Sequence, residues 1–316
     1  MKDHWQQNNG MTAFAWLCLL LVALPGMRAA APAVSLEGVI DLHCHSGPDT
    51  TARSVNDLHL ARLAKAAGMR GVVLKYHYTM TADRAQLAME EVPGVEVFGG
   101  IVLNTAVGGI NPEAVRRMIE VRGSRGKIVW LPTIDAENQV HFAKETRASV
   151  SVVRDGQPVP ELTPVFALLA RHDLALATGH SSADESLILI AAARQAGVKK
   201  ILVTHALAEA IGATPEKLRK LADLGAILEC TWLTHAPGAG GAINVGRALP
   251  VAEGVRLMRE IGFAHWIISS DFGQQHNPAP PEGMRAYIAA LRANDVSAAE
   301  IDRMARRNPA RLLGLD

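Results

Sequence analysis

The sequence predicts a single (β/α)8 TIM barrel over residues 36–316, preceded by a signal-like segment over residues 1–33. Short β-branched runs alternate with amphipathic stretches eight times across about 280 residues. Strands that alternate with helices in this way form parallel sheets, and a closed barrel of this kind typically needs about 250 residues. No linker or low-complexity tract interrupts the repeats. The fold class expected is therefore α/β, in one domain.

The composition is that of a globular chain and excludes several classes of partner. Of 316 residues, 49% are hydrophobic and 20% are charged. The 32 basic and 31 acidic residues give a net charge of +1 without a basic run, so we expect a small-molecule substrate and no nucleic acid. The three cysteines, Cys18, Cys44 and Cys230, match no zinc-finger or disulfide spacing.

The first 33 residues have the pattern of a secretory signal. An apolar run over 11–24 is followed by small residues suited to cleavage after Ala31 or Ala33. The run is short for a membrane span, so we expect an exported, periplasmic or secreted protein with no stable span after cleavage. An uncleaved anchor or a misassigned start are the alternatives, since Asp3 offsets Lys2. N-terminal sequencing decides between them: an intact Met1 on cytosolic protein would refute export.

The first half of the barrel contains four predicted strands, over residues 38–45, 71–77, 95–104 and 127–135. The first helix is expected to begin near Ser54, with Asp57 at a capping-box position, and to end at Gly68. A second helix is predicted over 82–91. The third begins at Asn111-Pro112 and ends near Gly123.

The second half contains four more predicted strands, over residues 173–180, 200–205, 226–232 and 265–271. The long connection 136–163 before them contains a predicted hairpin at Asp155-Gly156. Helices begin at Ser182, with Glu185 as its capping-box partner, and at Thr214-Pro215. A Gly-rich loop over 236–246 and two final helices complete the chain.

An open, doubly wound sheet is the competing architecture. Such a sheet normally carries a Gly-rich phosphate-binding turn after its first strand. Here the segment DLHCHSGPD (41–49) places a His-x-His pair at that position. The barrel is therefore the better prediction.

Polar side chains close five of the eight predicted strands. In a parallel barrel, the carboxyl ends of all strands meet on one face, which carries the active site. Five of the twelve histidines occupy such positions, together with one lysine and one aspartate. These residues are His43, His45, Lys75, His77, His180, His205 and Asp271.

Alternation along two strands supports a common site. Asp41, His43 and His45 are expected on one face of the first strand, with Ile40, Leu42 and Cys44 on the other, beneath helices. Residues Ile267, Ser269 and Asp271 are likewise expected to share a face. Imidazoles and a carboxylate in a confined site are ligands for zinc and similar cations.

These residues resemble the amidohydrolase superfamily of metal-dependent hydrolases, and the resemblance covers nearly all of residues 36–316. His-x-His ends the first strand, and the segments TGHSSADE, VTHA, SSDFGQ and NPARLLGL resemble those of the family's members. The resemblance implies one or two divalent ions, most simply Zn2+. The metal positions it assigns are His43, His45, His180, His205 and Asp271.

One departure concerns the residue that bridges two metals. Members with two metals carry a carbamylated lysine or a glutamate at the end of the fourth strand, where this chain has Asp135. Lys75 is the lysine in a comparable position, and its burial in an apolar strand would favour the neutral amine. A salt bridge to Asp41 or Asp135 is its alternative role. His77 is either a ligand or a substrate contact.

The resemblance implies hydrolysis of a C–N amide or lactone-type bond, with Asp271 as general base. With one metal, His205 would stabilise the developing oxyanion; with two, His180 and His205 would hold the second ion and Lys75 would bridge. A decarboxylase, an isomerase, a phosphoesterase or a non-catalytic metal-binding protein on such a barrel remain open. The substrate and the oligomeric state are not predicted.

Three further residues are weaker candidates. Glu229 ends the seventh strand, but the register that decides its side is undetermined. His235 and His276 lie in predicted rim loops and are candidate substrate contacts. The other histidines are expected at the surface or in packing: His4, His59, His141, His172 and His265.

Overall fold

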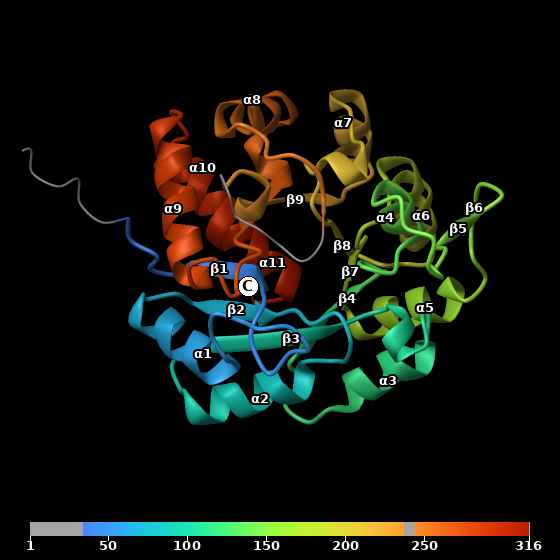
Figure 1. Ribbon diagram of the computed structural model, residues 1–316, viewed down its shortest axis with the longest axis horizontal. Coiled ribbons are helices and arrows are strands. Elements are labelled where there is room, and N and C mark those ends of the chain that lie inside the picture. The colour runs from blue at the N-terminus through green and yellow to red at the C-terminus, as the bar shows by residue number, and fades with distance from the viewer. Residues whose placement is uncertain (1–33, 237–243, 316) are drawn as a thin grey trace, which may run out of the picture. The chain divides into compact units, whose positions relative to one another are not determined.

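The computed structural model describes residues 34–236 and 244–315 (Figure 1). Eight parallel strands form one sheet in the order β1-β2-β3-β4-β7-β8-β9-β10. Their bounds are β1 Ile40–Cys44, β2 Gly71–Leu74, β3 Glu96–Val102, β4 Gly126–Trp130, β7 Ala175–Ala177, β8 Lys200–Val203, β9 Ile227–Thr231 and β10 Trp266–Ser269. The order follows the chain, as expected of a barrel rather than of a doubly wound sheet.

The last strand closes the sheet onto the first. The backbone N–H of Asp271 donates to the carbonyl oxygen of His43 at 2.9 Å, and that of His45 donates to the carbonyl oxygen of Phe272 at 2.8 Å. Cys44 and Phe272 form a parallel bridge. The predicted (β/α)8 barrel is confirmed, and its closure joins the His-x-His segment directly to Asp271.

Helices surround the strands (Figure 1). They are α1 Asp57–Ala66, α2 Ala82–Glu91, α3 Pro112–Glu120, α4 Glu137–Phe142, α5 Leu162–His172, α6 Ala183–Gln195, α7 Pro215–Asp223, α8 Val251–Ile261, α9 Pro280–Ala293, α10 Ala298–Asp302 and α11 Asn308–Leu313. The predicted caps at Asn111, Ser182 and Thr214 are confirmed, since each side chain accepts from a first-turn backbone N–H. The predicted hairpin is also present, as β5 Val153–Arg154 and β6 Gln157–Pro158.

The predicted start of the first helix is wrong by two residues. The cap is Asn56, whose side chain accepts from the backbone N–H of His59 at 2.8 Å. Ser54 instead donates its backbone N–H to the carbonyl oxygen of Gly273 at 2.9 Å. Ser54 therefore ties the loop after β1 to the end of β10, and the helix begins only after that contact.

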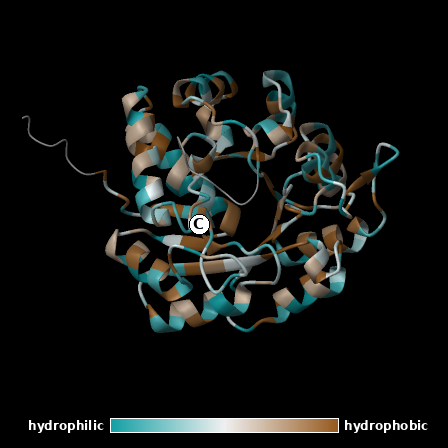
Figure 2. Cartoon of the chain, viewed as in Figure 1, coloured by the Kyte–Doolittle hydropathy of each residue, from teal (hydrophilic) through white to brown (hydrophobic). Residues whose placement is uncertain are grey.

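The core has an outer and an inner layer. The outer cluster fills the space between strands and helices, and the inner cluster lies inside the barrel. Figure 2 shows apolar residues along the strands, with polar residues on the outer faces of the helices. Ile267 of β10 belongs to the inner cluster, so Ser269 and Asp271 lie on that same side, as predicted. Ala310, Leu312 and Leu313 of α11 join the inner cluster.

The predicted faces of β1 are wrong, because the strand is irregular. Ile40 and Leu42 pack in the inner cluster, whereas Cys44 packs in the outer one. The register with β2 shifts between Asp41 and Cys44. Asp41 does not line the site: its Oδ1 accepts from the backbone N–H groups of His43 at 3.1 Å and Ser270 at 3.0 Å. This buried carboxylate therefore accepts hydrogen bonds from backbone N–H groups where the regular strand pairing is interrupted. Burial raises the pKa of Asp41 to about 6.

The predicted signal segment lies outside the described residues and stays a prediction. Within residues 34–236 and 244–315, no helix has both the length and the apolar character needed to cross a bilayer.

Candidate metal centre

A cavity of about 60 Å³ opens at the carboxyl ends of the strands. All six predicted metal-site residues line it, together with His77. They are His43 and His45 after β1, Lys75 and His77 after β2, His180 after β7, His205 after β8 and Asp271 after β10. Residues up to 228 positions apart in the chain therefore meet at one end of the barrel, as the strand-end pattern predicted.

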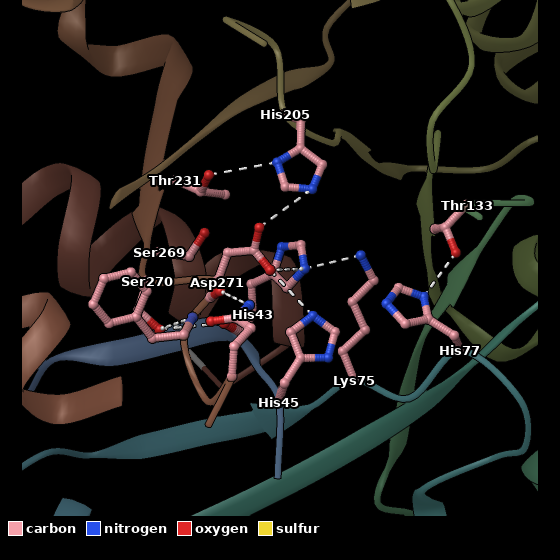
Figure 3. Close-up of polar contacts among 12 residues, drawn as sticks. His43, His45, Lys75, His77, Thr133, His205, Thr231, Ser269, Ser270 and Asp271 are labelled. Carbon is pink, nitrogen blue, oxygen red and sulfur yellow. Dashed lines mark hydrogen bonds and ion pairs between the residues drawn. The ribbon is translucent and has the colours of Figure 1, made fainter. Parts of the chain in front are cut away.

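Asp271 lies between His43, His45 and His205 (Figure 3). Its Oδ1 is 3.1 Å from Nε2 of both His43 and His45, and its Oδ2 is 3.6 Å from Nε2 of His205. Potential ligand atoms of His43, His205 and Asp271 all lie within 4.8 Å of one another. Burial alone would raise the pKa of Asp271, but the facing His43 and His205 hold it well below its ordinary value. The carboxylate is therefore ionised near neutral pH.

Glu229 on β9 orients His43. Its Oε1 and Oε2 lie 3.2 and 3.3 Å from His43 Nδ1, and Ser269 donates its hydroxyl to Oε1 at 2.5 Å. The register that the sequence left open is thus resolved, with Glu229 inside the barrel. Because Nδ1 donates to Glu229, Nε2 of His43 faces the cavity, and such a carboxylate–histidine pair is typical of metal sites.

Lys75 lies beside His43 in the lining of the cavity. Its Nζ is 2.8 Å from His43 Nε2, and the Lys75 side chain is fully buried. Burial lowers the pKa of Lys75 to about 8. Burial also acts to lower the pKa of His43, but Asp271 and Glu229 outweigh it and raise that pKa to about 9. The two carboxylates that favour a proton on His43 would equally favour a cation at its Nε2.

The predicted alternative partners of Lys75 are wrong. Asp135 accepts from Arg147 at 2.6 Å and from the backbone N–H of Thr105 at 2.9 Å, outside the cavity lining. Asp41 bonds to backbone groups, as described above. Lys75 instead lies near His43 and 5.6 Å from the centroid of the Trp130 ring.

Gln139 on α4 orients His180. The Gln139 Nε2 group donates to the carbonyl oxygen of Asn244 at 2.8 Å, so its Oε1 is the atom 2.9 Å from His180 Nδ1. Nδ1 must then be the protonated nitrogen, and Nε2 carries the lone pair. That Nε2 is buried without a hydrogen-bond partner in the described chain. An orphaned acceptor at this position fits a bound cation.

Unusual backbone conformations place the candidate ligands after β7, β8 and β10. His205 and Asp271 have φ of 53° and 56°, which is uncommon for residues other than glycine and recurs at functional sites. Gly179 precedes His180 with φ 63°, and a Cβ there would lie 2.3 Å from the carbonyl oxygens of Leu131 and Pro132. This position requires glycine, which allows the chain to turn His180 into the cavity.

His235 does not contact the cavity, so its predicted role as a substrate contact is wrong. Its Nδ1 donates to the carbonyl oxygen of Leu249 at 2.8 Å, and its Nε2 lies 3.1 Å from Cys230 Sγ. Both ring nitrogens are therefore used in packing behind β9. His276 is exposed and is not among the lining residues.

Several lining residues were not predicted from sequence: Thr51, Arg53, Tyr78, Ile134, Leu233, Val245 and Gln274. Most lie in loops that follow the strands. Arg53 could have been noticed in the sequence, because it lies eight residues after His45, in the loop before α1, where its cationic side chain could reach a site at the end of β1.

The fold and this cluster define a (β/α)8 barrel with a buried His/Asp centre at its carboxyl end. An organophosphorus hydrolase from Deinococcus radiodurans is similar at 15% identity and TM-score 0.55, over 89% of this chain and 93% of that one. A mutant organophosphorus hydrolase is 16% identical with TM-score 0.57, over 90% and 95% of the two chains. A third structure, engineered for organophosphate hydrolysis from a weak promiscuous lactonase template, is 15% identical with TM-score 0.56, over 90% and 98%. The barrel that the resemblance implied is thereby confirmed.

The sequence itself places the chain in a family. Residues 38–229 match the model of a family of unknown function, DUF6282. The chain belongs to this family. No curated protein matches it.

Proposed function

We propose that this chain is a metal-dependent hydrolase that cleaves a C–N amide or a lactone-type ester. The observation that carries the proposal is the convergence of five buried histidines and one buried carboxylate at one cavity. The similar structures, named as an organophosphorus hydrolase and a lactonase-derived enzyme, support a hydrolytic reaction on this fold.

The residues present fit a divalent cation, and zinc best. Imidazole nitrogens with one carboxylate are the ligands that zinc prefers. Nε2 of His180 has no hydrogen-bond partner among the described residues, and Nε2 of His43 faces the cavity. In each ring, a second residue fixes the orientation by bonding to Nδ1. A single ion would be held by His43, His45, His180 and Asp271. With two ions, His180 and His205 would instead hold the second one, and Lys75 would bridge the pair.

The cation, when bound, supplies a Lewis acid for the substrate carbonyl and a water of lowered pKa. The protein supplies the proton transfers. Asp271 is ionised, so it accepts the proton of the attacking water and returns it to the leaving nitrogen or oxygen. His205, whose pKa burial lowers to about 4, is a neutral imidazole and, with one ion, would stabilise the developing oxyanion.

Removing the metal should abolish hydrolysis. We expect dialysis against a chelator to lower turnover of the best substrate in a panel of lactones, N-acyl amino acids and cyclic amides by at least about 100-fold, because the carbonyl and the water lose their activation. Adding about one or two equivalents of zinc should restore it. Hydrolysis that persists in protein shown by elemental analysis to be metal-free would contradict the proposal. Release of phosphate from an aryl phosphate, without turnover of amides or lactones, would favour a phosphoesterase instead.

A further inference from the structure

Two cavity residues outside the proposed metal set, Arg53 and His77, can act only as hydrogen-bond donors toward the cavity. Both line it, one from the loop after β1 and the other after β2. We call this pair the donor subsite. The role of this pair lies in binding the substrate of the hydrolase proposed above, so it rests on that proposed function.

Arg53 is held in place by groups that leave its outer nitrogens free. Its Nε donates to Asp49 Oδ2 at 2.6 Å, and Asp49 Oδ1 accepts from the backbone N–H of Thr51 at 3.0 Å. The backbone of Arg53 also forms a bridge with Gln274. The Arg53 side chain is only 9% exposed, yet no residue of the described chain forms a hydrogen bond with its two terminal nitrogens.

The protonated nitrogen of His77 follows from its neighbours. Asn104 Oδ1 accepts from the backbone N–H of Thr133 at 2.8 Å, so Asn104 Nδ2 is the atom that donates to the carbonyl oxygen of His77 and to Thr133 Oγ1, both at 3.0 Å. The hydroxyl proton of Thr133 has one remaining partner in the described chain, His77 Nδ1 at 2.9 Å. Nδ1 is therefore the acceptor, and Nε2 carries the proton.

His77 differs from the proposed metal ligands in which of its ring nitrogens donates a hydrogen bond. In His43 and His180 the inner Nδ1 donates to a side-chain oxygen and Nε2 is the nitrogen available to a cation, whereas in His77 the inner Nδ1 accepts. The proton on Nε2 makes this nitrogen of His77 a donor rather than a metal ligand. Of the two roles expected for His77, this arrangement favours a substrate contact over a metal ligand.

We propose that Arg53 and His77 bind a free carboxylate of the substrate, beside the bond that is hydrolysed. Both donors line the cavity and have no hydrogen-bond partner for these nitrogens within the described chain, so an acceptor group of the substrate would satisfy them. The terminal nitrogens of a guanidinium match a carboxylate in a planar, two-bond arrangement. The substrate class is therefore an anionic amide or lactone that carries a carboxylate, such as an N-acyl amino acid.

Matched substrates test this inference on the zinc-loaded protein. We compare kcat/KM for N-acetyl amino acids with kcat/KM for the corresponding amides, which lack the negative charge. Wild type should prefer the acids by about 100-fold, and Arg53→Gln should reduce that preference to less than about 5-fold, since a hydrogen bond to a charged group accounts for about a 10- to 100-fold effect. His77→Phe, which keeps a ring against His45, should lower turnover of the acids by about 10-fold or more.

Two further variants show whether the preference depends on the paired donors of Arg53, on its charge alone, or on a general effect of replacing an arginine. Arg53→Lys keeps the charge but not the paired donors, and it should recover only part of the preference. Arg154→Gln, in the exposed hairpin strand β5, is the matched control and should leave the preference unchanged. Thermal unfolding of each variant shows whether it is folded.

The outcomes distinguish this inference from the proposed function. Equal turnover of acids and amides by wild type, or an unchanged preference in folded Arg53→Gln, would overturn the donor subsite and leave the hydrolase standing. If zinc-loaded protein hydrolyses none of the panel, calorimetric titration of metal-free protein with N-acetylglycine and N-acetylglycinamide decides. Tighter binding of the acid that is lost in Arg53→Gln supports the donor subsite; equal binding overturns it.

Discussion

Asp271→Asn should lower kcat by about 1,000-fold, because the substitution keeps the size of the side chain and removes its ability to accept a proton. Asp271 is the ionised group nearest to three imidazoles, with its Oδ1 3.1 Å from His43 and His45. KM should change less than kcat, since the loss falls on proton transfer in the transition state. Kinetics on zinc-loaded protein measure both constants.

The control for this variant is Asp155→Asn. Asp155 is exposed at the hairpin tip with φ 52°, a conformation that asparagine also adopts readily. It should leave kcat unchanged. Elemental analysis of Asp271→Asn separates loss of the base from loss of the ion. Nearly full activity in a metal-loaded, folded Asp271→Asn protein would show that another group transfers the proton.

Gly273→Ala should destabilise the fold by about 4 kcal/mol or more, which is exceptional for one methyl group. Gly273 has φ 124°, and a Cβ there would lie 1.7 Å from the carbonyl oxygen of His45. The clash is with backbone that also carries the His-x-His pair, so neither side can move without disturbing the barrel closure. Urea unfolding of metal-free protein measures the change in the free energy of unfolding.

Gly156→Ala is the matched control. Gly156 also has a left-handed φ, 72°, but nothing lies within 4 Å of a Cβ built there. Its expected cost is about 1 kcal/mol, the conformational penalty alone. If Gly273→Ala costs no more than Gly156→Ala, the close contact between the end of β10 and the His-x-His segment is not as described.

The fold could be predicted because short β-branched runs, typical of strands, alternate along the chain with amphipathic stretches that have helical periodicity. Alternating strands and helices determined the barrel, and the caps at Asn111, Ser182 and Thr214 were readable from local residue types. Asn56 was missed because several polar residues near the helix start could serve as caps, and the contact of Ser54 with Gly273 is not local. Tertiary contacts decided between equivalent local patterns.

The members of the candidate site could be predicted better than their environment. Each of the six lies at a strand end, and the barrel brings strand ends together. The side of Glu229 depended on register, and the faces of β1 depended on an irregularity that strict alternation cannot represent. Gln139 and Thr133 orient histidines that lie 41 and 56 positions away in the chain, so no spacing rule could connect them.

The direct test of the account is anomalous diffraction at the zinc edge from crystals grown with zinc. We expect a peak within coordination distance of Nε2 of His43, His45 and His180 and of a carboxylate oxygen of Asp271, with His77 Nε2 outside the coordination sphere. A peak elsewhere, or no ordered ion in this cavity at saturating zinc, would contradict the claim that these side chains form a metal centre.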